Sequence, residues 1–199
     1  MCGIAGYFNP DQNYAENPKQ NFHTLSRMIN TMNHRGPDTY GHTIINSCCL
    51  AHTRLSIIDL ENGRQPMSYT KDGNTYYIVY NGEIYNYKEV KKTLLRKNYT
   101  FETNSDTEVI IAAFCHYGPG FVKELNGIFA IAIYDSMRNT LYLYRDRFGV
   151  KPLYYTKTGD TLVFASRIDT LFEYPRVRPC IDMNSFNEIF SLGPAKTYG

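Results

Sequence analysis

The sequence predicts an α+β fold, an αββα sandwich in which two antiparallel sheets pack together with helices on their outer faces. Three observations favour this fold. The 199-residue chain is 15% aromatic, with 18 tyrosines, and contains many short β-branched and aromatic runs bounded by turns. These runs form two groups around two internal segments that we read as helices. The length fits one domain with a sizeable two-layer core, and no internal repeat or linker divides the chain.

The first part of the chain alternates strands with one helix. Residues 2–8 read as a strand, and the polar residues 9–21 read as a surface loop. Apolar side chains recur at helical spacing through residues 22–32, which predicts an amphipathic helix. Further strands are expected as two within residues 43–58 and a third at 75–80, followed at once by the Asn81-Gly82 pair. Gly82 indicates a tight backbone position at this strand end.

Two helices are predicted next, over residues 87–97 and 106–116. Each begins with a capping signal, in which a polar capping residue precedes a glutamate by three positions: Asn86 with Glu89, and Ser105 with Glu108. Four strands then read as an antiparallel meander, over residues 127–135, 140–145, 151–156 and 161–165. Asp182 is the expected cap of a last short helix over residues 183–190.

Composition excludes several classes of function. The formal net charge of +2, with 20% charged residues and no basic stripe, does not support nucleic acid as a partner. No apolar run is long enough to cross a membrane. Five cysteines without regular spacing indicate a reduced, cytoplasmic protein and no zinc site. Adjacent Cys48 and Cys49 are expected to point to opposite faces of a strand and to pack in the core.

The N-terminus offers a nucleophile. Removal of Met1 would leave the Cys2 thiol on the same residue as a free α-amine. The two groups have reference pKa values of about 8.5 and about 8, so the amine can accept the thiol proton and return it to a leaving amine. The alternative is a buried N-terminal strand that happens to begin with cysteine.

Three further elements suit amide chemistry on an amino acid. The Asn81 side-chain amide and the Gly82 N–H could stabilise an oxyanion, although a lone Asn-Gly pair is more often an ordinary turn. Arg54, an arginine among apolar residues, could pair with a substrate carboxylate or form an internal salt bridge. Asp106, at a helix start, could bind an ammonium group or simply interact with the helix dipole.

The chain resembles the N-terminal glutaminase domain of the class II, N-terminal-nucleophile glutamine amidotransferases, of the asparagine synthetase type. The motifs that carry the resemblance span nearly all of the chain in the family's order. They are MCGIAGYF at 1–8, RGPDTYG at 35–41, AHTRLSIIDL at 51–60, GRQPM at 63–67, YNGEIYNY at 80–87, SDTEVI at 105–110, NGIFAIAIYD at 126–135 and RDRFGVKPLYY at 145–155. The resemblance implies an αββα N-terminal-nucleophile hydrolase fold and a glutaminase domain over residues 2–199.

The resemblance also implies roles for single residues. Cys2 would be the nucleophile that forms a γ-glutamyl thioester, with Asn81 and Gly82 as the oxyanion hole. Arg54 would hold the α-carboxylate of L-glutamine and Asp106 its α-ammonium, and Glu83 would help to organise the ammonium end. We expect the RDRFG segment to shape a loop through buried pairing of an arginine with an aspartate.

In full-length relatives the ammonia travels to a synthetase domain that uses ATP and Mg to activate aspartate. We expect residues 2–199 to lack that domain and to work with it as a partner, either in cis or in trans. We also expect no cofactor to bind within residues 2–199, because they contain no Gly-rich pyrophosphate loop. One departure is Arg167, which stands where the family usually has glutamate.

Several alternatives stay open after the resemblance. The chain could be a regulatory or glutamine-binding domain that keeps Met1, an N-terminal cysteine hydrolase of another amide, or a glutaminase that serves another amidation. The aromatic excess could serve either a core or a homodimer interface.

Overall fold

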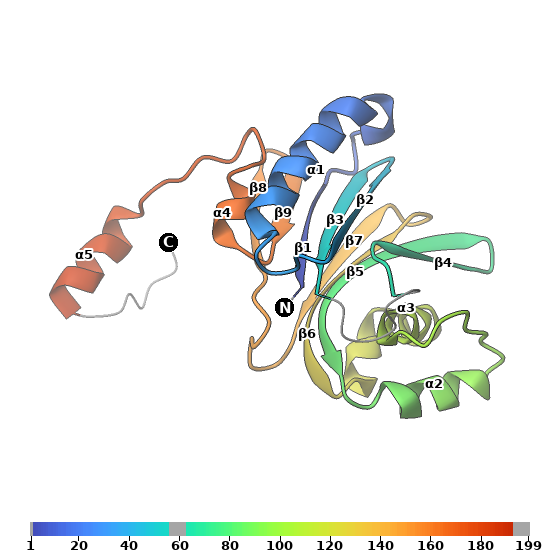
Figure 1. Ribbon diagram of the computed structural model, residues 1–199. Coiled ribbons are helices and arrows are strands. Elements are labelled where there is room, and N and C mark those ends of the chain that lie inside the picture. The colour runs from blue at the N-terminus through green and yellow to red at the C-terminus, as the bar shows by residue number, and fades with distance from the viewer. Residues whose placement is uncertain (1, 56–62, 193–199) are drawn as a thin grey trace.

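The computed structural model describes residues 2–55 and 63–192 and has two antiparallel sheets packed face to face, with helices on both outer faces (Figure 1). One sheet has five strands in the order β2-β3-β1-β9-β8, and the other has four in the order β4-β5-β6-β7. The predicted αββα sandwich is therefore confirmed. Met1 and the end of the second strand predicted within 43–58 lie outside the described residues.

The five-stranded sheet is covered by helix α1 (Pro18–Met32) and the short α4 (Ile168–Leu171). Its strands are β1 (Gly3–Phe8), β2 (Thr39–Ile45), β3 (Cys48–Arg54), β8 (Tyr154–Thr158) and β9 (Thr161–Ala165). The predicted loop over residues 9–21 was partly wrong, since it contains a 3-10 turn, η1 (Tyr14–Glu16), and the first turn of α1. That turn is polar and starts at a proline, so apolar periodicity could not reveal it.

The four-stranded sheet is covered by α2 (Tyr87–Leu95), α3 (Asp106–Tyr117) and the 3-10 segment η2 (Gly118–Glu124). Its strands are β4 (Met67–Lys71), β5 (Asn74–Ile84), β6 (Gly127–Asp135) and β7 (Thr140–Arg145). A last helix, α5 (Met183–Leu192), extends away from the layers (Figure 1). Asp182 caps it as predicted, because its carboxylate accepts hydrogen bonds from the Asn184 and Ser185 N–H groups.

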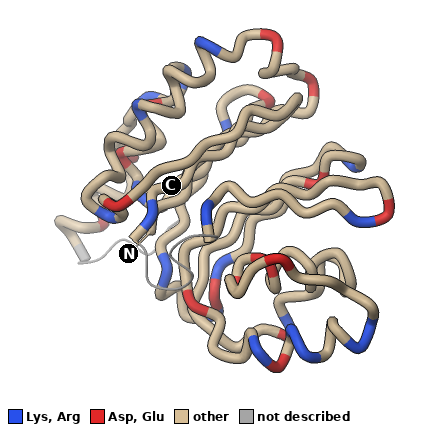
Figure 2. The backbone as a smooth tube through the Cα atoms, turned by 45° about the vertical axis from the view of Figure 1, so that its right-hand side comes forward, with Lys and Arg blue, Asp and Glu red and all other residues tan. Residues whose placement is uncertain are grey.

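A third apolar cluster fills the space between the sheets. It includes Ile4 of β1, Cys48 and Leu50 of β3, and Val79 of β5. Cys49 belongs instead to the cluster under α1, which confirms that the two adjacent cysteines face opposite sides of their strand. Figure 2 shows Lys and Arg positions interspersed with Asp and Glu positions along the described chain. No helix among residues 2–55 and 63–192 is long and apolar enough to cross a membrane.

The predicted four-strand meander was wrong. Strands β6 and β7 pair in one sheet, whereas β8 and β9 pair in the other, so the chain crosses between layers after Arg145. The crossing loop is held by Asp146, whose carboxylate accepts hydrogen bonds from four backbone N–H groups: Phe129, Phe148, Val150 and Lys151. Arg145 donates to the carbonyls of Gly149 and Lys151. Both side chains shape the loop, but through backbone contacts and not through the expected Arg–Asp pairing.

Strand β5 is longer than predicted and passes through Asn81 and Gly82 to Ile84. The pair therefore does not follow a strand end. Asn81 faces Ala130 of β6 in the antiparallel register. On its other side β5 pairs with β4, and this pairing ends before Asn81 is reached, since the last β4–β5 pair joins Met67 to Ile78. One edge of β5 is consequently open beside Asn81 and Gly82.

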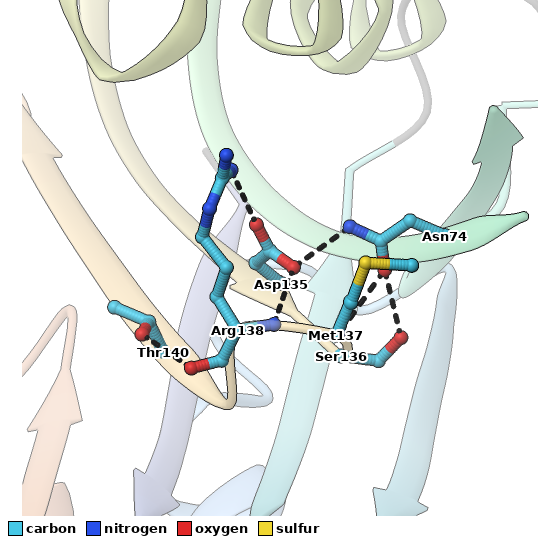
Figure 3. Close-up of polar contacts among 6 residues, drawn as sticks. All are labelled: Asn74, Asp135, Ser136, Met137, Arg138 and Thr140. Atoms are coloured by element: carbon cyan, nitrogen blue, oxygen red, sulfur yellow. Dashed lines mark hydrogen bonds and ion pairs between the residues drawn. The ribbon is translucent and has the colours of Figure 1, made fainter. Parts of the chain in front are cut away.

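A buried polar network holds the far end of β5 (Figure 3). The Asn74 amide donates to Asp135 at 2.8 Å and accepts hydrogen bonds from Ser136 and Met137, while Arg138 pairs with Asp135 at 3.1 Å. The Asp135 carboxylate is fully buried, so these donors replace the water that it lost on folding. The network anchors the β5–β6 register.

The two capping predictions had different outcomes. Ser105 caps α3, since its hydroxyl accepts a hydrogen bond from the Thr107 N–H. Glu108 does not complete a capping box, because it accepts hydrogen bonds from Glu102 and Thr103 instead. Asn86 precedes α2 but makes no side-chain cap. Its amide joins Glu124 and Asn126, which tethers the start of α2 to the start of β6.

Candidate active site

One pocket of about 130 Å³ is lined by all six residues that the sequence singled out: Cys2, Arg54, Asn81, Gly82, Glu83 and Asp106. Its remaining lining includes His52, Leu55, Gln65, Tyr80, Thr107 and Lys151. The residues come from both sheets and from the start of α3. Segments far apart in the sequence therefore meet at one place between the layers.

Strand periodicity explains how the two sheets meet there. Side chains two residues apart on a strand share a face. Ile4, Leu50 and Val79 point into the space between the sheets, so Cys2, His52 and Asn81 are directed to the same space. Gly3 pairs with Thr53 in the β1–β3 register, which brings Cys2 beside Arg54 at the same end of the sheet.

The Cys2 side chain and backbone are both held. The Leu55 N–H donates to Cys2 Sγ at 3.4 Å, and the thiol lies 3.6 Å from the Leu55 carbonyl oxygen, which can accept its proton. The Leu55 backbone therefore contacts the sulfur through both its N–H and its carbonyl group. The Arg35 guanidinium donates through Nε to the Cys2 carbonyl at 3.1 Å. These contacts orient the sulfur toward the pocket before any substrate binds.

Arg167 lies close to Arg35, whose pKa its charge affects. It forms an ion pair with Asp169 and a 2.8 Å hydrogen bond with His34 Nε2. Burial lowers the pKa of Arg35, and the nearby charge of Arg167 lowers it further. The arginine that stands in place of the expected glutamate thus finds its own carboxylate partner two residues later.

Asn81 is a buried amide with an unused donor. Its side chain is 2% exposed, and Nδ2 has no hydrogen-bond partner among the described residues. A buried N–H group without a partner costs about 1–3 kcal/mol, so such a group calls for an explanation. Because Asn81 lines the pocket that holds Cys2, the unused donor is suited to an acceptor on a ligand.

The Gly82 N–H points to the open edge of β5. The Tyr80 N–H donates to Gln65 Oε1, and the Ile84 N–H donates to Asp106 Oδ2. Both N–H groups lie on the edge of β5 that faces β4, beyond the last residue that β4 pairs with. Alternate residues of a strand present their N–H groups to the same edge, so the Gly82 N–H lies on that edge between them. A side chain at Gly82 would collide with the backbone, since a Cβ would lie 2.2 Å from the Ile128 carbonyl oxygen.

Two basic side chains of β3 line the pocket. Arg54 is 6% exposed, and a buried guanidinium requires anionic or carbonyl partners. His52 is 1% exposed, and burial lowers its pKa to about 3, so its imidazole is neutral. The Nε2 atom of His52 is buried without a partner in the described part of the chain.

Asp106 begins α3 and is 6% exposed. Its Oδ2 accepts a hydrogen bond from the Tyr80 hydroxyl at 2.9 Å and from the Ile84 N–H at 3.4 Å. Burial raises the pKa of Asp106, while the bond from Tyr80 opposes this shift. A cation placed in the pocket would relieve the cost of the buried charge. Glu83 is exposed and lines the same pocket, so it adds negative charge to this end.

Sequence reasoning missed several of these contacts. His52 and Tyr80 lie beside chosen residues within the quoted motifs, and Gln65 and Arg35 lie in motifs to which no binding role was assigned. Leu55 acts through its backbone, which no residue pattern reveals. Within residues 2–55 and 63–192, no group of three or more His, Cys, Asp or Glu side chains could hold a metal ion.

The chain is similar to several known proteins. The family model described as a glutamine amidotransferase domain matches residues 1–198. Asparagine synthetase [glutamine-hydrolyzing] 3 of Bacillus subtilis is 40% identical over 199 residues, which cover all of this chain and 32% of that protein. Asparagine synthetase B of Escherichia coli is 40% identical over 165 residues, or 82% of this chain and 28% of that protein. The amidase chyE of Penicillium rubens is 36% identical over 181 residues, or 87% of this chain and 26% of that protein.

The chain spans about a third or less of the length of these curated relatives. A solved structure of the glutamine phosphoribosylpyrophosphate amidotransferase from B. subtilis, complexed with ADP and GMP, has a TM-score of 0.63 at 19% identity. The match covers 85% of this chain and 42% of that one. At this identity the likeness concerns the fold alone.

Proposed function

The chain belongs to the glutamine amidotransferase family, and we propose that it hydrolyses L-glutamine to glutamate and ammonia. It corresponds to the glutaminase part of glutamine-hydrolysing asparagine synthetases. The observation that carries the proposal is that four groups line one pocket. They are a hydrogen-bonded thiol, a buried amide donor without a partner in the described part of the chain, a buried arginine and a buried aspartate: Cys2, Asn81, Arg54 and Asp106. We propose that the domain spans residues 2–199.

The reaction begins at Cys2 after removal of Met1. The free α-amine takes the thiol proton, and the thiolate attacks the side-chain amide carbon of glutamine. The tetrahedral intermediate collapses, the C–N bond breaks, and ammonia leaves with the proton from the α-ammonium. Water then attacks the γ-glutamyl thioester, the amine takes its proton, and the released thiolate recovers that proton. The Leu55 N–H at 3.4 Å from sulfur supports the thiolate in both steps.

The oxyanion of each tetrahedral intermediate requires donors placed before the charge forms. In this proposal Asn81 Nδ2 and the Gly82 N–H supply them. The unpartnered amide of Asn81 supports this role, because a donor left unused in the resting protein is free for the transition state. One such donor typically contributes about 3–4 kcal/mol to transition-state stabilisation.

The amino-acid head group is bound at the other end of the pocket. We assign Arg54 to the α-carboxylate, because a guanidinium fork matches both carboxylate oxygens. Asp106 takes the α-ammonium, and Glu83 adds negative charge beside it. Burial of Arg54 and Asp106 supports the assignment, since the two charges of the glutamine head group would complement these two buried charges in a site screened from water.

The ammonia passes, in this proposal, to a synthetase domain in cis or in trans. That domain would use ATP and Mg²⁺ to activate aspartate, which yields asparagine. A second candidate is a glutaminase that serves another amidation, because the chain is also similar to the amidase chyE over 87% of its length. The free state of all five cysteines supports a reducing, cytoplasmic location.

The test is an intact-protein mass spectrum before and after incubation with a diazo-ketone analogue of glutamine. We expect a chain without Met1 that gains one adduct, and no adduct in Cys2→Ala. An N-acylated glutamine should not protect the thiol, whereas glutamine should. A chain that keeps Met1 and stays unlabelled would contradict the proposal and favour a non-catalytic binding domain.

A further inference from the structure

Tyr80 is a buried tyrosine whose hydroxyl reaches the pocket aspartate. It is 3% exposed, it precedes Asn81 on β5, and its hydroxyl donates to Asp106 Oδ2 at 2.9 Å. Helix α3 packs on β5 (Figure 1). The hydrogen bond from the Tyr80 phenol to Asp106 therefore joins the strand to the start of the helix. A hydrogen bond to a charged acceptor in a site screened from water is stronger than one between neutral groups.

A second connection joins the same strand to the same helix turn. Gln65 Oε1 accepts a hydrogen bond from the Tyr80 N–H at 2.6 Å, and its Nε2 donates to Thr107 Oγ1 at 3.2 Å. The Ile84 N–H adds a contact to Asp106 Oδ2 at 3.4 Å. The first turn of α3 is therefore fixed to β5 at Asp106 and at Thr107, and the Tyr80 hydroxyl is a side-chain donor to the Asp106 carboxylate itself.

The electrostatic balance makes this donor important. Burial raises the pKa of Asp106, the bond from Tyr80 lowers it, and the negative charge of Glu83 raises it. Burial and the charge of Asp106 raise the pKa of Tyr80 well above its ordinary value, so the phenol keeps its proton. Tyr80 is thus a permanent donor that favours the ionised carboxylate, which is the form that binds an ammonium group.

We propose that Tyr80 is a positioning residue, which holds the Asp106 carboxylate ionised and oriented and so selects substrates with a free α-ammonium group. This inference rests on the proposed function. Tyr80 touches neither the reacting amide nor the thiol in this arrangement. Its effect is expected in substrate binding and in pH dependence, not in the chemical step.

The test compares Tyr80→Phe, which removes one oxygen atom and keeps the ring, with the matched control Tyr76→Phe. Tyr76 lies on the same strand and packs against the same apolar cluster, but it does not line the pocket. For Tyr80→Phe we expect KM for glutamine to rise about tenfold, with kcat within twofold of the parent chain. Tyr76→Phe should leave both constants unchanged.

The pH profile gives a readout that a merely structural role would not move. Loss of the phenol should shift the acid limb of kcat/KM toward higher pH, because Asp106 then accepts a proton more readily. The other titratable or charged groups that line the pocket remain in place in this variant: Cys2, His52, Arg54, Glu83 and Lys151. In an Asp106→Asn background, Tyr80→Phe should have no further effect on KM, since the residue acts through that carboxylate.

The outcomes separate the two proposals. A parent chain that releases ammonia, with a Tyr80→Phe variant of unchanged KM and unchanged acid limb, overturns the role of Tyr80 and leaves the glutaminase intact. A tenfold KM increase that persists in the Asp106→Asn background also overturns it. A processed parent chain that neither binds glutamine nor releases ammonia overturns the proposed function, and the role of Tyr80 with it.

Discussion

Two asparagines on one strand should respond in opposite ways to truncation. Asn81 and Asn74 both lie on β5, at 2% and 6% exposure. The Nδ2 of Asn81 has no partner among the described residues, whereas the Asn74 amide donates to Asp135 and accepts from Ser136 and Met137 (Figure 3). Asn81→Ala therefore tests the oxyanion donor, and Asn74→Ala is the structural control.

The expected magnitudes follow from these contacts. An unpaired buried donor costs about 1–3 kcal/mol, and Asn81→Ala removes that cost. This gain offsets the packing contacts that the variant loses, so the free energy of unfolding should change by less than about 1 kcal/mol. Its kcat should fall by about 10²–10³, which corresponds to about 3–4 kcal/mol of transition-state stabilisation, with KM little changed. Asn74→Ala should lose about 2–3 kcal/mol of stability, because Asp135 stays buried with one donor fewer, and should keep its kcat.

The assays are ammonia release followed with glutamate dehydrogenase, and urea unfolding of each variant. The reasoning is refuted if Asn81→Ala retains full kcat. It is also refuted if Asn81→Ala loses as much stability as Asn74→Ala, since the Asn81 amide would then hold the fold and not an oxyanion.

Gly82→Ala should abolish ammonia release and lower the unfolding midpoint, because the added Cβ would lie 2.2 Å from the Ile128 carbonyl oxygen; a variant with the parent's melting curve and activity would contradict this. Arg54→Lys should raise KM for glutamine by about tenfold or more with a smaller effect on kcat, since an ammonium cannot form the bidentate pair, and unchanged steady-state kinetics would count against the carboxylate assignment. Burial alone would raise the pKa of Asp146, but hydrogen bonds from backbone N–H groups, that of Lys151 first, hold this pKa below its ordinary value. The ionised Asp146 therefore stabilises the fold at pH values above the ordinary pKa. This stabilisation is lost as the pH falls through the lowered pKa of the folded state. Asp146→Asn should therefore unfold about 1–3 kcal/mol more easily at pH 7, and this difference in urea unfolding should shrink below about pH 4; a difference that is constant with pH would show that the charge is irrelevant.

Local patterns predicted the separate parts of this protein well. Helical spacing located the apolar face of α1, and capping chemistry located the start of α3 and of α5. Such signals depend on neighbours within a few residues, which the sequence contains directly. Some predictions failed locally, such as the loop over residues 9–21, whose polar helical turns have no apolar periodicity. The larger failure concerns partners from elsewhere in the chain. The expected meander fails because β9 pairs with β1, and β8 with β9, in the other sheet, and turn length alone does not say which sheet a strand joins.

The sequence by itself determined the α+β class, the family resemblance and the identity of six pocket residues, because residue type and spacing carry that chemistry. Only the tertiary structure decided how these residues cooperate. Asn81 and Gly82 lie inside a strand whose other neighbour ends early, and this leaves one N–H edge open beside the thiol. The contact from Tyr80 to Asp106 likewise joins residues 26 positions apart. Such contacts are set by how sheets and helices pack, which depends on the whole chain and not on local spacing.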